Sequence, residues 1–128
     1  TLTWQQNRVW ATPESLWQHA LKINPESSFV LNNVGNVHLL KKDLHGAQGY
    51  YLKALRANPF NPTAWYNLGY ISEARRDMPK ALKYYQEFVN LGDLHWQQQI
   101  AQLQAELRRK YGVRLVKTQF DPSVLAEN

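Results

Sequence analysis

The side chains best able to do chemistry in this sequence are four histidines and a scatter of carboxylates, because the chain has no cysteine. The histidines are His19, His38, His45 and His95, and their spacing places no metal-ligand set on a shared helix face. The lack of cysteine excludes disulfides and thiolate metal sites. No glycine-rich phosphate loop follows a strand pattern. We therefore expect no enzyme activity, no metal and no cofactor.

The carboxylates at defined positions are Asp43, Asp77 and Asp93, and an apolar helical pattern follows each of them. An aspartate at such a position accepts hydrogen bonds from the free N–H groups of the first helical turn. These three residues are predicted helix caps, which gives them a structural role in place of acid–base chemistry.

The chain repeats itself with a period of 34 residues. Moving residues 28–61 forward by this period places Asn33 on Asn67 and Gly35 on Gly69. The further identities are Asp43 with Asp77, Ala47 with Ala81, Tyr50 with Tyr84 and Tyr51 with Tyr85. A fixed period of this length indicates a stack of helical repeats. His38 and Ser72 occupy the same position in successive repeats, so they are not a base and its nucleophile.

Apolar residues at helical spacing, with caps and stops between them, predict an all-α chain. We expect helices at about 13–23, 28–41, 44–57, 62–75, 78–91 and 94–110. Gly112 is a natural C-terminal stop for the last of them. These elements predict a helical domain over residues 1–112, and residues 113–128, which have no clear period, are expected to form a loosely ordered tail.

The length of 128 residues predicts one domain. The net charge is +5, and the sequence has no apolar run long enough to span a membrane. The basic residues cluster at three helix ends, in Lys41-Lys42, Arg75-Arg76 and Arg108-Arg109-Lys110. Such charges complement the helix dipole, so nucleic-acid binding is not expected. The first residue is Thr, so we expect a piece or a processed product of a longer protein.

The run Trp65-Tyr-Asn-Leu-Gly-Tyr70, with Ala81, Tyr85 and a proline such as Pro59, resembles the tetratricopeptide repeat (TPR) family. The resemblance covers about residues 13–89 and implies a helix-turn-helix solenoid with a half repeat, two full repeats and a C-terminal capping helix. In this family each glycine lets the first helix of a pair approach the second. Ala47, Ala54 and Ala81 are expected to supply the matching small surface.

The same resemblance implies a non-catalytic module that binds a protein or peptide in a groove lined by the first helices. The groove residues it implies are Asn32, Asn33, Asn36, Tyr66, Asn67 and Tyr70, with Leu40 and Glu73 beside them. Asn33 and Asn67 either pair with the backbone of a partner peptide or connect successive repeats, and both alternatives stay open. Lys and Arg are missing from these positions, which argues against a clamp for a C-terminal carboxylate.

Two positions depart from the family pattern. Lys42 and Arg76 stand where a glycine usually forms the turn within a pair, so these turns are expected to be reshaped. His38 and Ser72 stand where an aromatic residue usually ends the first helix, so these helix ends are expected to pack less tightly.

A second resemblance lies ahead of the repeats, in Asn7-Arg8-Val-Trp10, Glu14-Ser-Leu-Trp17 and Asn24-Pro25. These motifs are similar to the segment after the last membrane helix in bacterial glycosyltransferase-like membrane proteins with a TPR tail. This resemblance implies an extracytoplasmic accessory domain and slightly favours the periplasmic side, with membrane contact through the parent chain. Pairing of two copies through Trp4, Trp10 or Trp96 is a further hypothesis.

Overall fold

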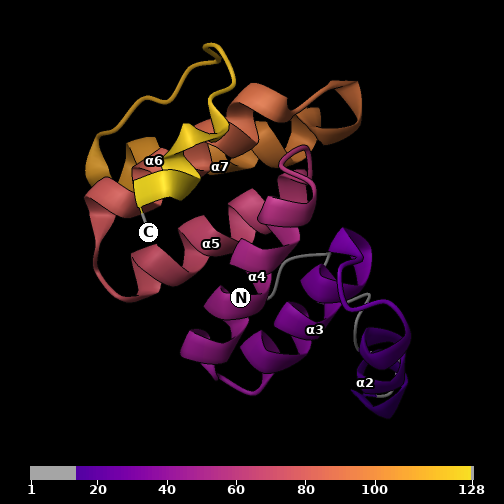
Figure 1. Cartoon of the computed structure of the whole chain (residues 1–128). Coiled ribbons are helices and arrows are strands. Elements are labelled where there is room, and N and C mark those ends of the chain that lie inside the picture. The colour runs from indigo at the N-terminus through magenta and orange to yellow at the C-terminus, as the bar shows by residue number, and fades with distance from the viewer. Residues whose placement is uncertain (1–13, 128) are drawn as a thin grey trace.

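The computed structural model describes residues 14–127, and within this range the chain is helical and contains no strand. The helices are α2 (Glu14–Ile23), α3 (Ser28–Leu40), α4 (Leu44–Ala57), α5 (Pro62–Ala74), α6 (Met78–Leu91) and α7 (Gln97–Tyr111). Two short 3-10 helices, η1 (Leu94–Trp96) and η2 (Pro122–Glu127), flank α7 and its following loop. Figure 1 shows the helices following one another in chain order, from α2 at one end to α6 and α7 at the other. The prediction of an all-α TPR-type solenoid is confirmed.

The helices pack as pairs, with the closest associations between α3 and α4 and between α5 and α6. The second helix of each pair begins at a predicted aspartate cap. Asp43 accepts from the Gly46 N–H at 3.0 Å, and Asp77 accepts from the Lys80 N–H at 3.2 Å. The same local chemistry, repeated at the period of the sequence, therefore starts α4 and α6 in the same way.

The glycines on the first helices lie against tyrosine rings of the second helices. A Cβ atom added to Gly35 would lie 2.7 Å from the Tyr51 ring, and one added to Gly69 would lie 2.4 Å from the Tyr85 ring. Both rings are almost completely buried. The partner of each glycine is thus a large aromatic ring, and the predicted small residues, Ala47, Ala54 and Ala81, fill fully buried positions elsewhere in the core.

The expectation that the turns at Lys42 and Arg76 are reshaped is wrong. Both residues keep the left-handed conformation that glycine usually supplies, with φ of 63° and 61°. Each turn is closed by two backbone hydrogen bonds of 2.9 Å, such as those from Lys42 N to Leu39 O and from Arg76 N to Glu73 O. These bonds satisfy carbonyls at the helix ends and offset a backbone strain of about 1–2 kcal/mol per residue.

The helix ends at His38 and Ser72 are well packed. The His38 ring stacks on the Tyr50 ring, with centroids 5.1 Å apart and planes 22° apart. Its Nδ1 lies 2.8 Å from Asp43 Oδ2. Ser72 is buried, with 6 % of its surface exposed. The expectation of looser packing is therefore not met at Ser72, which is buried, whereas His38 stays partly exposed and is held by its stacking and hydrogen-bond contacts.

Residues 113–127, hereafter the strap, lie against α6, where the sequence predicts a loosely ordered tail (Figure 1). Val113, Leu115 and Phe120 pack against the core formed by α4 to α7. Side chains of α6 and α7 form hydrogen bonds with the strap, including one of 2.9 Å from Gln104 to the Leu115 carbonyl. These partners lie 11 to 34 residues away in sequence. Local periodicity could not have found them.

Candidate functional site

The histidines and carboxylates are the side chains of residues 14–127 that could hold a metal ion or transfer a proton. No group of three or more histidines and carboxylates in this range lies close enough to hold a metal ion. The pair His38 and Asp43 belongs to the cap of α4. The Gly46 N–H, and secondly His38, lower the pKa of the Asp43 carboxyl below its usual value. This carboxylate therefore serves the helix terminus.

The structure divides the six predicted groove residues into two sets. Asn32, Asn36 and Asn67 are buried, with 7 %, 2 % and 0 % of their surfaces exposed. Asn33, Tyr66 and Tyr70 are half-buried. All six lie on the first helices of the two pairs, α3 and α5. Only the second set offers substantial side-chain surface to a partner.

Asn36 lies at the centre of a buried network that connects the repeats. Its Oδ1 accepts from the Tyr51 hydroxyl at 2.5 Å and from Asn67 Nδ2 at 3.1 Å. The first bond joins α3 to α4, and the second joins α3 to α5 of the next pair. Burial raises the pKa of Tyr51 well above its usual value. Asn67 is thus a connector between repeats, through a side chain.

Asn33, the counterpart of Asn67 in the preceding repeat, makes a different contact. Its Nδ2 donates to Phe29 O at 2.8 Å, within its own helix. The preceding element is α2, which contains no buried residue, whereas α5 stacks on a complete helix pair. The two asparagines therefore share a sequence position and differ in their environment.

Two buried amide oxygens in the groove set lack a hydrogen-bond partner within the described part of the chain. They are Asn32 Oδ1 on α3 and Asn67 Oδ1 on α5. A buried acceptor without a donor costs about 1–3 kcal/mol. An incoming N–H or a water that reached either oxygen would remove this cost.

Tyr66 and Tyr70 lie one turn apart on α5 and present aromatic surface. The Tyr66 ring is fixed between Tyr85 and Phe88, with ring centroids 5.8 Å and 5.3 Å away. Burial, and secondly the charge of Glu106, raises the pKa of Tyr66 to about 12. The Tyr66 side chain is therefore held in place with its hydroxyl protonated.

Glu73, at the C-terminal end of α5, connects three helices. The sequence did not predict this arrangement. The Oε1 atom of Glu73 accepts from the Tyr85 hydroxyl of α6 at 2.7 Å, and its Oε2 accepts from the Tyr111 hydroxyl of α7 at 2.8 Å. Tyr111 is 38 residues from Glu73 and lies outside the repeat pattern, so no sequence signal marked it. This contact places the end of the capping helix over the last repeat.

The basic helix ends are paired with neighbouring side chains. Lys41 forms an ion pair of 2.5 Å with Glu14 of α2, and Lys110 forms one of 3.0 Å with Glu106. The Arg75 guanidinium donates to Gln48. One residue of each basic cluster therefore pairs with a neighbouring side chain, and the role of the clusters at the helix ends stays a prediction.

Trp96, named above as a possible pairing residue, is partly buried and packs on Phe88 at 5.9 Å. Trp4 and Trp10 lie outside the described residues.

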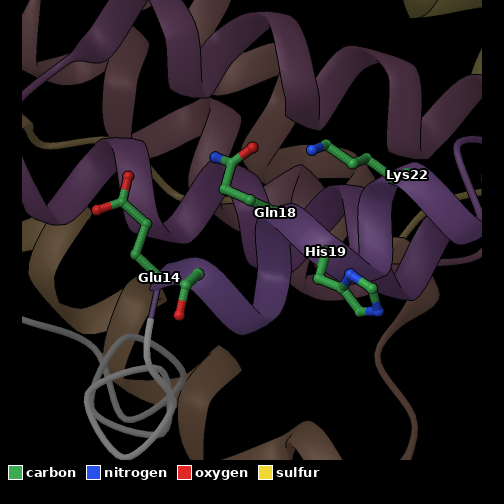
Figure 2. Close-up of a pocket in the computed structure, with 5 residues that line it drawn as sticks. Glu14, Gln18, His19 and Lys22 are labelled. Carbon is green, nitrogen blue, oxygen red and sulfur yellow. The ribbon is translucent and has the colours of Figure 1, made fainter.

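A shallow hollow runs along α2 and is the subject of Figure 2. Its described lining comes from one helix and consists of Glu14, Ser15, Gln18, His19 and Lys22. Glu14 also carries the ion pair to Lys41 of α3. A polar surface that one helix lines does not converge several groups on a substrate, so we assign no chemistry to it.

The paired helices, the stacked pairs and the covered last repeat define a helical repeat solenoid whose first helices carry the candidate site. Residues 35–93 match the family model of the tetratricopeptide repeat, so this part of the chain belongs to that family. Repeats of this family commonly mediate protein–protein interaction, and their domains are generally non-catalytic scaffolds. No curated protein matches the sequence. Among the helices of residues 14–127, none has the length and apolar character needed to cross a lipid bilayer.

Proposed function

We propose that this chain is a non-catalytic protein-interaction module that binds a segment of a partner protein along α3 and α5. The observation that carries the proposal is the pair Tyr66 and Tyr70, half-buried and one turn apart on a first helix. Asn33, also half-buried, offers an amide on the neighbouring first helix. The three side chains span both repeats.

The tyrosines suit a binding surface because each combines a large apolar ring with a polar tip. The Tyr66 ring is already held by Tyr85 and Phe88, so little side-chain entropy is lost when a partner covers it. Its hydroxyl is protonated at neutral pH, as in any tyrosine, and can donate a hydrogen bond to the partner.

The asparagines have separate roles in this proposal. Asn36 and Asn67 connect the repeats and hold α3 and α5 in register. Asn32 and Asn67 each have an unpaired Oδ1, and of the two residues only Asn32 retains some exposed surface, 7 %. An N–H of a bound segment that reached it would gain a hydrogen bond that the free chain lacks.

Charge near the tyrosines disfavours an acidic ligand. The carboxylates of Glu106 and Glu73 both act on Tyr66. They would repel a C-terminal carboxylate, and the predicted groove positions hold no Lys or Arg to bind one. The partner segment we expect is therefore neutral or basic and contacts the rings through apolar side chains.

The test is a selection of peptides against the full chain, followed by affinity measurement on variants. We expect Tyr70→Ala combined with Asn33→Ala to weaken binding of the selected peptides by about tenfold or more. The matched control is Arg56→Ala, an exposed position on the second helix α4, which should leave affinity unchanged. Peptide-induced NMR shifts should map to Asn33, Tyr66 and Tyr70. Binders that ignore the double variant and shift other residues would contradict the proposal.

The alternative function, an accessory domain of a membrane-bound glycosyltransferase-like protein, stays a prediction. Its motif lies in residues 7–25, and residues 7–13 are outside the described range. Within the motif, Trp17 packs edge-on against Phe29 of α3 at 5.6 Å. That contact is ordinary packing and favours no membrane role.

A further inference from the structure

The hydrogen bonds between the strap and α6 use mainly the main chain of the strap. Gln86 Nε2 donates to Val116 O at 2.8 Å, and the Asp121 N–H donates to Glu87 Oε1 at 2.8 Å. These bonds use the backbone of the strap, so they do not depend on which side chains it carries. Val116 is 58 % exposed, in agreement with a strap that α6 holds by its backbone.

Asn90 binds the centre of the strap with both ends of its amide. Its Oδ1 accepts from the Thr118 N–H at 2.7 Å, and its Nδ2 donates to Gln119 O at 3.1 Å. The Thr118 hydroxyl donates to the same Oδ1 at 3.1 Å. An amide that pairs with a main-chain N–H and the next C=O recognises extended backbone, and the hydroxyl contact adds a preference for Thr or Ser.

One aromatic side chain anchors the strap. The Phe120 ring lies edge-on to Trp65 with centroids 6.0 Å apart, and 5.4 Å from the Phe60 ring. Trp65 is fully buried, whereas Phe60 remains 65 % exposed. The surface thus recognises three successive residues, at positions 118 to 120: a residue with a hydroxyl group, any residue, and an aromatic residue.

We propose that the surface of α6 beneath the strap is a docking site for an extended partner segment with this hydroxyl–any–aromatic pattern. The strap is its tethered competitor. Glu87 and Asn90 are 5 % and 7 % exposed under the strap, and both are polar groups that require partners when covered. The site is distinct from the groove, because it uses α6 and the start of α5 and none of Asn33, Tyr66 or Tyr70.

A partner protein fits this site better than a second copy of the chain does. The strap of a second copy would make the same bonds but lacks the tether, whose effective concentration is about millimolar for a short link. A partner segment can bind more tightly than the strap by covering Phe60, an apolar side chain that the strap leaves 65 % exposed. Gly112, with φ of 67°, forms the junction from which the strap departs.

The test uses a fluorescent peptide with the sequence of residues 113–127 and full-length chains. Phe120→Ala weakens the chain's own strap and leaves the α6 surface unchanged. We expect the peptide to bind this variant about tenfold or more tightly than it binds the wild-type chain. Adding Asn90→Ala should remove that binding. The matched control is Lys117→Ala, an exposed strap residue, which should behave like the wild type.

Peptide variants and a second strap variant make the outcome decisive. Peptides with Ala in place of Thr118 or Phe120 should bind the Phe120→Ala chain more weakly. If circular dichroism shows that this chain does not fold, Thr118→Pro replaces it, since proline removes the N–H that Asn90 accepts. No binding to a folded strap variant, or equal binding with and without Asn90, would overturn the proposal. A wild-type chain that light scattering shows to be a strap-exchanged dimer at micromolar concentration would also overturn it.

Discussion

Asn67 Nδ2 donates to Asn36 Oδ1 at 3.1 Å, across the boundary between the two repeats and inside the core. This bond decides, for Asn67, between the two roles left open by the sequence. Asn67 has no exposed surface, so in this structure it connects the repeats. Asn33, its counterpart, remains half-buried and bonds to its own helix.

The two asparagines should therefore differ in their effect on stability. We expect Asn67→Ala to lower the free energy of unfolding by about 1 kcal/mol, because the mutation removes a buried hydrogen bond and leaves a small cavity, while loss of the unpaired Oδ1 offsets part of this cost. Asn33→Ala should change it by about 0.5 kcal/mol or less, since the lost bond is exposed. Urea denaturation measures both values. Equal losses would contradict the difference in role.

The approach of the paired helices predicts a graded response to alanine at the glycines. Gly69→Ala should destabilise the protein by about 1–3 kcal/mol, because its Cβ would lie 2.4 Å from the buried Tyr85 ring. Gly35→Ala, with 2.7 Å to Tyr51, should cost less. Thermal and urea unfolding would show the order.

Gly49 provides the matched control for these glycines. It is exposed in α4, and a Cβ added there has no atom within 4 Å. Gly49→Ala should therefore raise stability by about 0.5–1 kcal/mol, through helix propensity. If all three substitutions stabilised the chain, the close packing of glycine on tyrosine would be wrong.

The left-handed turns predict that glycine is the better residue at two charged positions. Lys42→Gly and Arg76→Gly should each raise the free energy of unfolding by about 0.5–1 kcal/mol. Relief of the backbone strain at φ near 60° exceeds the entropy gained by the unfolded chain. Lys42→Ala and Arg76→Ala retain the strain and should give no gain. A gain with alanine would instead assign the effect to the removed charge.

The buried tyrosines predict a loss of stability in alkaline solution. The pKa of Tyr66 is raised to about 12, and those of Tyr51 and Tyr85 are also raised, chiefly by burial. Below about pH 10 these hydroxyls are protonated in both states, so stability does not depend on them. Above it the unfolded chain releases protons that the folded chain retains, so the free energy of unfolding falls as pH rises.

Tyr66→Phe tests this pH dependence at one residue. Between pH 10 and 12 the variant should lose about 1 kcal/mol less per pH unit than the wild type. Denaturation at several pH values gives the slope, and absorbance near 295 nm follows ionisation of the tyrosines. The same slope in both proteins would show that Tyr66 titrates normally.

Much of the fold follows from local sequence. The period of 34 residues, the caps Asp43 and Asp77 and the glycines Gly35 and Gly69 predicted the two helix pairs, because helix starts and close helix contacts depend on nearby residues. The six predicted groove residues do lie on the first helices, α3 and α5. The sequence did not predict their burial, because that depends on what each helix stacks against.

At the turns, too, the sequence predicted part of the result and the folded structure decided the rest. The sequence marked Lys42 and Arg76 as unusual, yet the hydrogen bonds to Leu39 and Glu73 hold them in the left-handed conformation. The position of the strap depends even more on the folded structure, since Asn90 bonds to residues 28 and 29 positions away in the sequence.

By itself, the sequence determined that this protein is a stack of helix pairs, because a repeated pattern of caps, glycines and apolar residues acts locally and repeats its effect. Only the tertiary structure decided that Asn67 connects the repeats while Asn33 bonds within its own helix. The helix of Asn67 stacks on a complete preceding pair, whereas the helix of Asn33 is preceded only by α2. The tertiary structure also decided that residues 113–127 cover α6, because that contact joins groups brought together by folding alone.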